Sequence, residues 1–357
     1  MRAIRFDRFG ERPVLQEVPD PRPSTRGVVL RVEASGLCRS DVHGWLGHDD
    51  GIALPHVPGH EVVGVIDEVG PEVERFRVGQ RVTTPFVCAC GRCAECASGN
   101  GQVCRNQTQP GFTHWGSFAE RVALHDADVN LIEVPTGLDA GAAALLGCRF
   151  ATAYRGLIHQ AELARDESLV VVGCGGVGLS AVMIGVAVGA RVIAVDVDPV
   201  ALERALSLGA SGVVNSAGRP DDEVVDEIRR LARGGRAGAG HGADGADVSV
   251  EALGRESTVR TAIRSLGARG RHVQIGLFAD DPRVPLGEVI ARELQLFGSH
   301  GMPAPAYAGL LELVLTGALK PELLISRRIG LAEVPDALVA MASGAPAAGV
   351  TMIDVSR

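Results

Sequence analysis

The stretch 169–196, LVVVGCGGVGLSAVMIGVAVGARVIAVD, decides the fold that this sequence predicts. It opens with an apolar run at 169–172, and no charged residue occurs from 168 to 190. Those 23 residues could span a bilayer by length alone, but they contain six glycines, four of them crowded near the start. The pattern favours a buried parallel strand, a glycine turn and a buried helix, which are apolar because other elements cover both faces of the sheet.

The glycine turn has the spacing G-x-G-x-x-G at Gly173, Gly175 and Gly178, and Asp196 ends the next expected strand 18 residues later. Glycines at these places allow a tight turn and the close approach of a pyrophosphate to the helix N-terminus. An acidic residue after the second strand can accept the ribose hydroxyls. The context predicts a dinucleotide site; the alternative is a glycine-rich turn in another kind of α/β protein. Val197, and not an arginine, follows Asp196, which favours NAD over NADP.

Strands and helices alternate from 169 onward. Six strands joined by crossovers predict a doubly wound parallel sheet. The glycine-rich segment 234–245, which contains His241, is expected to be a solvated loop. The expected strands lie at 169–172, 191–195, 212–215, 247–252, 272–275 and 293–297.

The helices between these strands carry recognisable end signals. Asp198 is a good N-cap for a helix that Gly209 ends. Amphipathic patterns predict two further helices at 221–233 and 256–266, the second ended by Gly267.

Residues before about 150 follow a different pattern of short strands separated by glycine and proline, which predicts a small irregular barrel. The tail has a helical segment at 306–315, then loses the alternation, and ends in an apolar strand at 349–355. We expect that last strand to return to the first domain. The expected strands of the first domain lie at 1–6, 27–34, 60–69, 80–85 and 117–124.

Four cysteines, Cys90, Cys93, Cys96 and Cys104, stand as C-x2-C-x2-C-x7-C in the cysteine- and glycine-rich insert 88–109. Four thiolates can hold one tetrahedral Zn²⁺ and leave no vacant position, as in a structural site. The insert has few core residues, so we expect a lobe that its metal organises. The alternatives are redox-labile surface thiols and a zinc ribbon that binds nucleic acid.

Three further candidate ligands, Cys38, His60 and Cys148, are scattered along the first domain. Three soft ligands would leave a fourth position for water or substrate, which is the arrangement of a catalytic zinc site. Cys88 and Cys174 are expected to be bystanders. A metal and a dinucleotide in one chain indicate hydride transfer.

Bulk composition narrows the function classes. The chain has 357 residues, with 46% hydrophobic and 22% charged residues, which is ordinary for a globular enzyme of two domains. A net charge of −8 provides no basic surface for nucleic acid or an anionic membrane. The charged residues at 1–8 are not typical of a signal peptide, so the eight cysteines are expected to stay reduced in the cytoplasm.

Motifs along essentially the whole chain resemble one family. They are G-x-C-x-S-D-x-H at 36–43, G-H-E at 59–61, G-C-x-F-x-T at 147–152, the four-cysteine insert and the glycine turn. In this combination the sequence resembles a zinc-dependent alcohol dehydrogenase of the medium-chain dehydrogenase/reductase family.

The resemblance implies an α/β architecture with two domains. One would be a GroES-like β-barrel catalytic domain made of 1–150 and 298–357, with the zinc lobe at 88–109. The other would be a Rossmann NAD-binding domain over 151–297.

The resemblance also implies roles for individual residues. Cys38, His60 and Cys148 would ligate the catalytic zinc, with Glu61 near the metal as an alternative or transient ligand, and the lobe would hold a second, structural zinc. Asp41 would hold the far nitrogen of His60, and Ser40 and His43 would relay the alcohol proton. The implied cofactor and pocket residues are Arg39, Thr152, Gly173, Gly175, Gly176, Val177, Gly178, Asp196, Ile275 and Leu277 for NAD, and Phe86 and Trp115 for the substrate.

The implied reaction is reversible hydride transfer between a primary or secondary alcohol and NAD, which also reduces aldehydes and ketones. A polyol dehydrogenase and a carbonyl (keto ester) reductase use the same scaffold, so the sequence leaves the substrate open. Two other classes stay in view: a metal-free quinone or enoyl reductase, and a non-catalytic zinc or nucleic-acid binding module. We expect a homodimer or homotetramer whose partners are small alcohols, aldehydes or ketones, with no nucleic acid or membrane partner.

Overall fold

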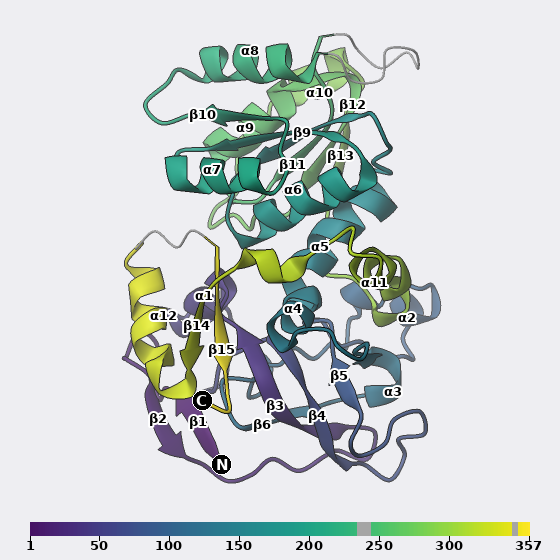
Figure 1. Cartoon of the computed structure of the whole chain (residues 1–357), viewed down its shortest axis with the longest axis vertical. Helices are drawn as coiled ribbons and strands as arrows, with labels where there is room; N and C mark the ends of the chain where they lie inside the picture. The colour runs from purple at the N-terminus through teal and green to yellow at the C-terminus, as the bar shows by residue number, and fades with distance from the viewer. Residues whose placement is uncertain (234–243, 345–348) are drawn as a thin grey trace. The chain divides into compact units, whose positions relative to one another are not determined.

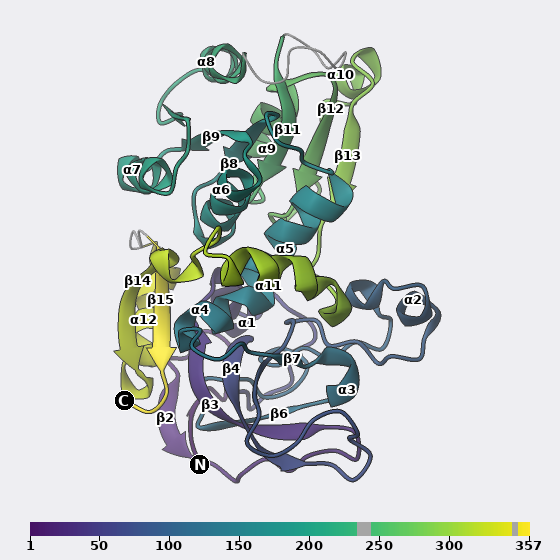
Figure 2. The same cartoon turned by 45° about the vertical axis from the view of Figure 1, so that its right-hand side comes forward.

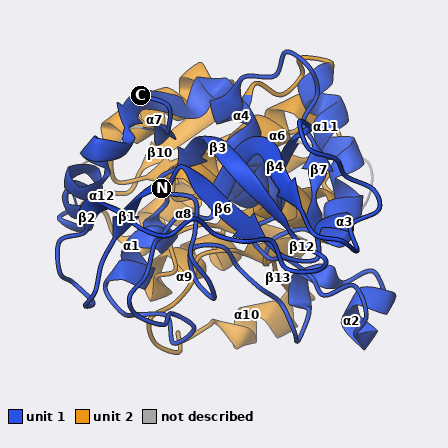
Figure 3. Cartoon of the chain, turned by 90° about the horizontal axis from the view of Figure 1, so that it is seen from below, with its two compact units in different colours: residues 1–151, 301–315, 321–357 blue, residues 152–300, 316–320 orange. Residues whose placement is uncertain are grey.

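The computed structural model describes residues 1–233, 244–344 and 349–357, which form two compact units, coloured separately in Figure 3. Unit 1 comprises Met1–Ala151, Gly301–Leu315 and Pro321–Arg357, and unit 2 comprises Thr152–His300 and Thr316–Lys320. Most of the expected loop at 234–245, including His241, lies outside the described residues.

Unit 2 is built on a sheet of six parallel strands in the order β10-β9-β8-β11-β12-β13. The strand order reverses between β8 and β11, and in such sheets ligands bind at the carboxyl ends of the strands beside this reversal. The doubly wound sheet predicted from the sequence is therefore confirmed. The strands are β8 Ser168–Val172, β9 Arg191–Asp196, β10 Gly212–Asn215, β11 Ala246–Glu251, β12 Leu266–Gln274 and β13 Gln295–Gly298.

Helices connect these strands and pack on the sheet (Figures 1 and 2). The Asp198 carboxylate accepts a hydrogen bond from the Val200 amide at 2.9 Å, and Gly209 has φ +100°, so both predicted end signals are confirmed. The helices of unit 2 are α5 Ala151–Tyr154, the π-helix η3 Arg155–Gln160, α6 Gly176–Val188, α7 Pro199–Ser207, α8 Asp221–Ala232, α9 Glu256–Arg264 and α10 Leu286–Ala291, with Ala151 itself in unit 1.

One helix boundary was wrong. The helix expected to run to 266 ends at Arg264, and β12 already begins at Leu266. Leu266 is fully buried and lies opposite Ala246 of β11, so sheet pairing replaces the helical pattern before Gly267 is reached.

Unit 1 contains a mixed sheet in the order β14-β15-β3-β4-β5-β7, with β6 also paired to β3. A separate antiparallel pair, β1 and β2, lies at the N-terminus. The sequence did not predict the short strands β2 and β7. The first-domain strands are β1 Arg2–Arg5, β2 Val14–Glu17, β3 Val28–Gly36, β4 Glu61–Val69, β5 Arg81–Thr83, β6 Arg121–Leu124 and β7 Ile132–Glu133.

Short helices of unit 1 contain or adjoin several of the candidate site residues. They are α1 Arg39–Trp45, α2 Ala94–Ala97, η1 Gly101–Val103, α3 Ala127–Asn130, α4 Ala140–Leu145 and the π-helix η2 Leu146–Phe150.

The C-terminal tail completes the sheet of unit 1, as expected. Strand β15 (Val350–Asp354) runs antiparallel to β3 and parallel to β14 (Ile325–Gly330) (Figure 1). The expectation that the tail loses its alternation was wrong, because α12 (Val334–Ala342) links β14 to β15. The sequence ISRRIG of β14 places both arginines at exposed positions, so it lacks the apolar pattern of a buried strand.

The remaining elements of the tail lie before and after β14. They are η4 Ala304–Tyr307, α11 Ala308–Leu315, η5 Pro321–Leu324 and, after β14, η6 Leu331–Glu333. Among the described residues, no helix is both long and apolar enough to cross a membrane.

Candidate metal centres and dinucleotide site

Unit 1 gathers the three scattered candidate ligands of the sequence into one cluster. Cys38 immediately precedes α1, His60 immediately precedes β4, and Cys148 lies in the π-helix η2. Ligand atoms of these three residues and of Glu61 all lie within 4.8 Å of one another. A π-helix is rare and often marks a functional site, because its extra residue redirects the side chains that follow. The cluster could hold a metal ion.

Asp41 fixes the orientation of His60, as the resemblance implied. Its fully buried carboxylate accepts hydrogen bonds from His60 Nδ1 at 2.8 Å, from the Cys38 amide at 2.9 Å and from the Gly59 amide at 3.2 Å. His60 Nε2 is buried and has no hydrogen-bond partner of ordinary geometry among the described residues. An imidazole that donates through Nδ1 presents the Nε2 lone pair to a metal, so this orphaned atom fits a metal site.

The two thiols of the cluster are electrostatically unequal. A hydrogen bond from Cys148 holds the pKa of Cys38 well below its usual range, with His60 and Arg149 adding to the effect against burial. The hydrogen bond with Cys38, together with burial, raises the pKa of Cys148 well above its usual range. Burial lowers the pKa of His60, but interactions with Asp41 and Cys38 outweigh burial, so the pKa of His60 lies well above its usual value. Since the thiolate is the metal-binding form, Cys38 is ready to bind a cation.

Glu61 is not free beside the cluster, because it forms a buried ion pair with Arg149. Arg149 Nε donates to Oε1 of Glu61 at 2.8 Å and Nη2 donates to Oε2 at 2.5 Å. Arg149 is 4% exposed and Glu61 is fully buried. Sequence analysis missed this arginine. The available signal was a charged residue directly after Cys148 in an otherwise apolar stretch.

Helix α1 carries the remaining polar residues implied for catalysis. Ser40 and His43 are three residues apart and share one face of the helix. Ser40 Oγ lies 3.8 Å from Cys38 Sγ, and His43 Nδ1 lies 3.3 Å from Nδ1 of His48. Partial burial lowers the pKa of His43, and His48 and Arg39 lower it further. Arg39 is exposed, and its Nη1 donates to the Met341 carbonyl at 3.1 Å.

Two phenylalanines line the imidazole of His60. The Phe86 ring centroid lies 6.1 Å from that of His60, and the Phe112 centroid lies 5.3 Å from it. Phe86 was expected in the substrate pocket, whereas Phe112 was missed because a single phenylalanine in a turn has no distinguishing pattern. Apolar rings beside a metal ligand would exclude water and contact an apolar part of a substrate.

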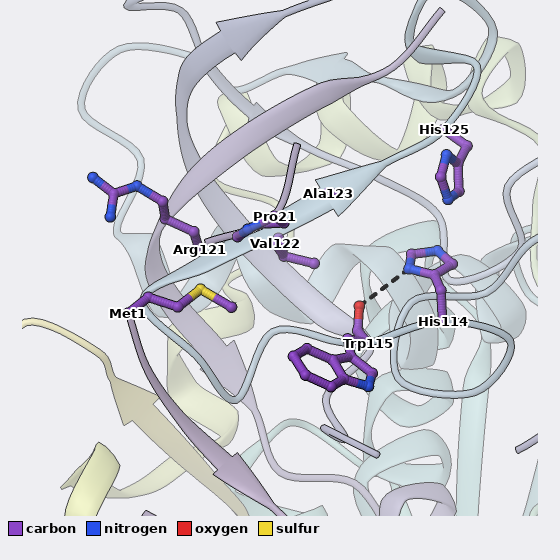
Figure 4. A pocket seen from close by; sticks show the side chains of 8 residues that line it. All are labelled: Met1, Pro21, His114, Trp115, Arg121, Val122, Ala123 and His125. Atoms are coloured by element: carbon purple, nitrogen blue, oxygen red, sulfur yellow. Dashed lines mark hydrogen bonds between the residues drawn. The ribbon is translucent and has the colours of Figure 1, made fainter. Parts of the chain in front are cut away.

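Trp115 lies in a different pocket of unit 1, shown in Figure 4. Its Nε1 donates to the Pro55 carbonyl at 2.9 Å. The pocket has a volume of about 230 Å³, and no candidate metal ligand lines it. A substrate role for Trp115 therefore stays a prediction without support from this geometry. The side chains that line it are Met1, Pro21, His114, Trp115, Arg121, Val122, Ala123 and His125.

The other tryptophan, Trp45, belongs to the core of unit 1. It is 6% exposed, and its Nε1 donates to the Glu11 carbonyl at 2.6 Å.

The four lobe cysteines form a second cluster, whose sulfur atoms lie within 4.8 Å of one another. Cys93 Sγ lies 3.4 Å from Cys96 Sγ and 3.6 Å from Cys104 Sγ. Tetrahedral zinc with Zn–S bonds of about 2.3 Å requires sulfur separations of roughly 3.8 Å, so the group fits. Besides cysteines, the lobe's small hydrophobic cluster contains only Ala89 and Val129 among the described residues. The lobe therefore has little apolar core of its own, which is typical of a segment that a bound metal would organise.

The two remaining cysteines belong to neither cluster. Cys88 is buried against Thr84, and Cys174 is buried with its thiol against the Val195 carbonyl. Burial raises the pKa of Cys88 to about 11, which leaves it an inert thiol.

The glycine turn of unit 2 has the geometry of a phosphate cradle. Gly173 follows β8 with φ +95°, and a Cβ on Gly178 would meet the Gly173 carbonyl oxygen at 1.7 Å. Both glycines are therefore required by the turn and by the packing of α6 on the sheet. Gly175 is the N-cap of α6 and is exposed, with nothing within 4 Å of a Cβ placed there. Gly176 and Val177 follow in the first turn of α6, so their amides begin the helix that would face a pyrophosphate.

Asp196 ends β9 beside this turn. Its carboxylate accepts hydrogen bonds from the amides of Cys174 at 2.6 Å, Val197 at 2.7 Å and Asp198 at 2.9 Å. A carboxylate has about four lone-pair sites, so capacity remains for a ribose hydroxyl.

A buried carboxylate that the sequence did not reveal, Glu251, organises the carboxyl end of β11. It is fully buried and accepts from the Gly254 amide at 2.9 Å, from Thr258 Oγ1 at 2.7 Å and from Gln274 Nε2 at 2.5 Å. Its carbonyl accepts from the Gly276 amide at 3.0 Å. These bonds join the loops that follow β11 and β12 into one piece.

The remaining predicted cofactor residues of unit 2 differ in exposure. Ile275 is half-buried and Leu277 is 79% exposed, and both lie in the loop that Glu251 holds. Thr152 is buried, and its carbonyl accepts from Ser299 Oγ at 3.1 Å.

Comparisons with known proteins agree with these two halves. Residues 24–136 match the family described as "Alcohol dehydrogenase GroES-like domain", and residues 176–316 match "Zinc-binding dehydrogenase". The chain is 32% identical over 348 residues to an NAD-dependent alcohol dehydrogenase of Sulfurisphaera tokodaii, which covers 95% of each chain. It is 30% identical over 337 residues to an L-threonine 3-dehydrogenase of Sinorhizobium medicae, which covers 92% of each chain.

Among solved structures, alcohol dehydrogenase TADH from Thermus sp. ATN1 is similar along the whole chain. The TM-score is 0.88 at 30% identity, with 99% of this chain and 100% of that chain covered. The α/β architecture with a GroES-like and a Rossmann domain is confirmed by these matches. Sequence, fold and relatives together place the chain among the zinc-dependent alcohol dehydrogenases of the medium-chain dehydrogenase/reductase family.

Proposed function

We propose that the protein is an NAD-dependent zinc alcohol dehydrogenase that oxidises a primary or secondary alcohol and, in reverse, reduces the aldehyde or ketone. The observation that carries the proposal is the group of Cys38, His60 and Cys148. His60 Nε2 is aimed away from Asp41 and has no hydrogen-bond partner of ordinary geometry among the described residues. The glycine turn and Asp196 in unit 2 supply the second requirement, a place for NAD.

Each cofactor would have its own residues. Cys38, His60 and Cys148 would hold a catalytic zinc with one open position, and Cys90, Cys93, Cys96 and Cys104 would hold a structural zinc. When bound, the catalytic zinc lowers the pKa of an alcohol and NAD accepts its hydride. Gly173, Gly175, Gly176, Val177 and Gly178 would bind the NAD pyrophosphate, and the further cofactor contacts are proposed at Arg39, Thr152, Asp196, Ile275 and Leu277.

The chain's own residues would handle orientation and the proton. Asp41 keeps Nδ1 of His60 protonated, so that Nε2 stays a ligand. Ser40 Oγ would accept the alcohol proton beside Cys38, and His43 would release it to solvent from the exposed end of α1. Phe86 and Phe112 would exclude water around His60 and contact the substrate.

The alternatives concern the substrate. Polyols and keto esters suit the same cofactors, and similarity to an L-threonine 3-dehydrogenase adds a β-hydroxy amino acid such as L-threonine as a second candidate substrate. A panel of these alcohols and carbonyl compounds, followed by NADH absorbance, separates them by kcat/KM. We also propose a cytoplasmic location. It is supported by the eight free cysteines, six of which belong to the two candidate metal clusters.

We further propose a homodimer or homotetramer that forms at β13. This strand ends the sheet of unit 2, so one of its sides has no strand partner among the described residues. Large apolar side chains are exposed on β13 and on the preceding helix α10, including Leu296, Leu286 and Ile290. An unpaired apolar edge can pair with the same edge of a second copy, which continues the sheet across a two-fold axis.

Oligomer formation tests this surface. We expect light scattering after size exclusion to give two or four times the chain mass of 37.2 kDa for the wild type. Leu296→Lys should shift the protein toward the monomer, because it places a charge in the apolar edge. The control Val78→Lys, at an exposed position of unit 1, should not. A monomeric wild type, or an unchanged mass for Leu296→Lys, contradicts the proposal.

Metal content tests the two clusters. We expect two Zn²⁺ per chain in freshly purified protein. Cys93→Ser should lower the melting temperature, because the lobe depends on its metal. Cys148→Ser should abolish turnover and leave the protein folded, because its site is catalytic. Elemental analysis, thermal melts and an NADH-absorbance assay of turnover check the three in turn, and finding one metal or none in the wild type would rule out the assignment.

Cofactor choice tests Asp196. A carboxylate there accepts ribose hydroxyls but repels a 2′-phosphate. Asp196→Gly combined with Val197→Arg should move kcat/KM toward NADP. Val200→Arg, which adds a cation nearby without removing the acid, should keep the NAD preference. The assignment fails if the unmodified enzyme has a higher kcat/KM with NADPH than with NADH.

The proton relay predicts a pH dependence. Because the pKa of His43 is lowered from 6.5, the neutral, proton-accepting form persists below that pH and is lost only in more acidic solution. His43→Gln should slow alcohol oxidation by roughly ten- to a hundred-fold near neutral pH, the lower range for general acid–base effects. His48→Gln should instead raise the pKa that governs oxidation, since a repelling neighbour is gone. Superimposable pH profiles of kcat for the wild type and His43→Gln would leave the relay without support.

A further inference from the structure

The ion pair between Glu61 and Arg149 joins the two segments that carry catalytic-zinc ligands. Glu61 directly follows His60, and Arg149 directly follows Cys148. Each segment thus contributes one ligand and one member of the pair. The contact is bidentate, because Nε and Nη2 of the guanidinium group each lie within hydrogen-bond distance of one carboxylate oxygen. Such a fork fixes the carboxylate in direction as well as in charge.

Glu61 is nevertheless close enough to bind the metal. One of its carboxylate oxygens belongs to the set of ligand atoms that lie within 4.8 Å of one another. The Glu61 carboxylate fits in its paired position only because residue 36 is glycine: a Cβ on Gly36 would meet Oε2 of Glu61 at 2.0 Å. Arg149 Nη2 further donates to the Leu37 carbonyl at 3.4 Å, which anchors the guanidinium on the strand end before Cys38.

Charge explains why a buried carboxylate here needs a partner. Two thiolates from Cys38 and Cys148 already neutralise a zinc ion, so Glu61 would add an uncompensated negative charge. Leaving a charge unpaired in a buried site is strongly unfavourable. The carboxylate can be neutralised either by the metal or by Arg149. Burial raises the pKa of Glu61, and Arg149 opposes this.

We propose that Arg149 is a positioning residue that keeps Glu61 off the catalytic metal and so keeps the fourth coordination position open for substrate. This inference rests on the proposed function, because it requires a metal at Cys38, His60 and Cys148. Without Arg149, Glu61 would turn to the metal as its remaining source of positive charge and close the site.

Cobalt substitution makes the open position visible. Co²⁺ bound by thiolates absorbs in the visible range, and imidazole added to an open position changes that spectrum. A cobalt ion in the four-cysteine lobe has no open position and does not respond to imidazole. The imidazole-dependent difference spectrum therefore reports only the catalytic site.

Arg149→Met should raise the apparent Kd for imidazole at least ten-fold and slow the loss of metal to a chelator. The double variant Arg149→Met with Glu61→Gln should return both to within about two-fold of the wild type, because the competing ligand is gone. Arg149→Lys, which keeps the charge but not the fork, should fall between and serves if Arg149→Met does not fold.

A purely structural role for the ion pair predicts different results. Arg149→Met and Arg149→Lys would then lower the melting temperature but keep the wild-type spectrum and imidazole affinity, which would overturn the proposal. An unrestored double variant would also overturn it, since Glu61 would not be the closing ligand. If the wild-type protein shows no imidazole-sensitive cobalt at all, the proposed function itself fails.

Discussion

The hydrogen bond from His60 Nδ1 to Asp41 is the contact on which the geometry of the candidate metal cluster depends. Asp41 lies in α1, His60 lies at the start of β4, and the same carboxylate caps the Cys38 amide and holds Gly59. One buried side chain therefore fixes two ligand-bearing segments and the tautomer of the imidazole. Cys148, the third candidate ligand, lies in the π-helix η2, whose extra residue changes the direction of the side chains that follow. The chemistry proposed for the chain requires all of these positions together.

Buried charge is the main constraint around that contact. Cys38, Cys148, Glu61 and Arg149 lie together in a largely buried part of unit 1, where ionised groups are favourable only in pairs or with a metal. Unit 2 solves a similar problem differently, because no cationic side chain pairs with Glu251 among the residues that the structure describes. It is stabilised by amide and hydroxyl donors from the loops that follow β11 and β12. The carboxylates of Glu61 and Glu251 each join two segments of their unit at a candidate site.

Local patterns in the sequence were sufficient to predict features that depend on residues close together in the chain. The apolar strand before Gly173, the cap at Asp198 and the cysteine spacing each depend on neighbours a few residues away, and the structure contains all three. The scattered ligands needed the family resemblance, since no local pattern links Cys38 to Cys148. The Glu61–Arg149 pair spans 88 residues, and Glu251 meets Gln274 across 23. Such contacts depend on strand register, and a polar edge strand such as β14 has no apolar pattern to reveal it.

We propose that the chain needs a metal at Cys38, His60 and Cys148 to transfer hydride to NAD. The most direct measurement strips the protein with a chelator and follows NADH formation from an alcohol while zinc is returned stepwise. We expect turnover to vanish when the metal is removed. The first equivalent of zinc should restore thermal stability by binding in the lobe, and the second should restore activity. Full NADH formation by protein that elemental analysis finds free of metal would contradict it.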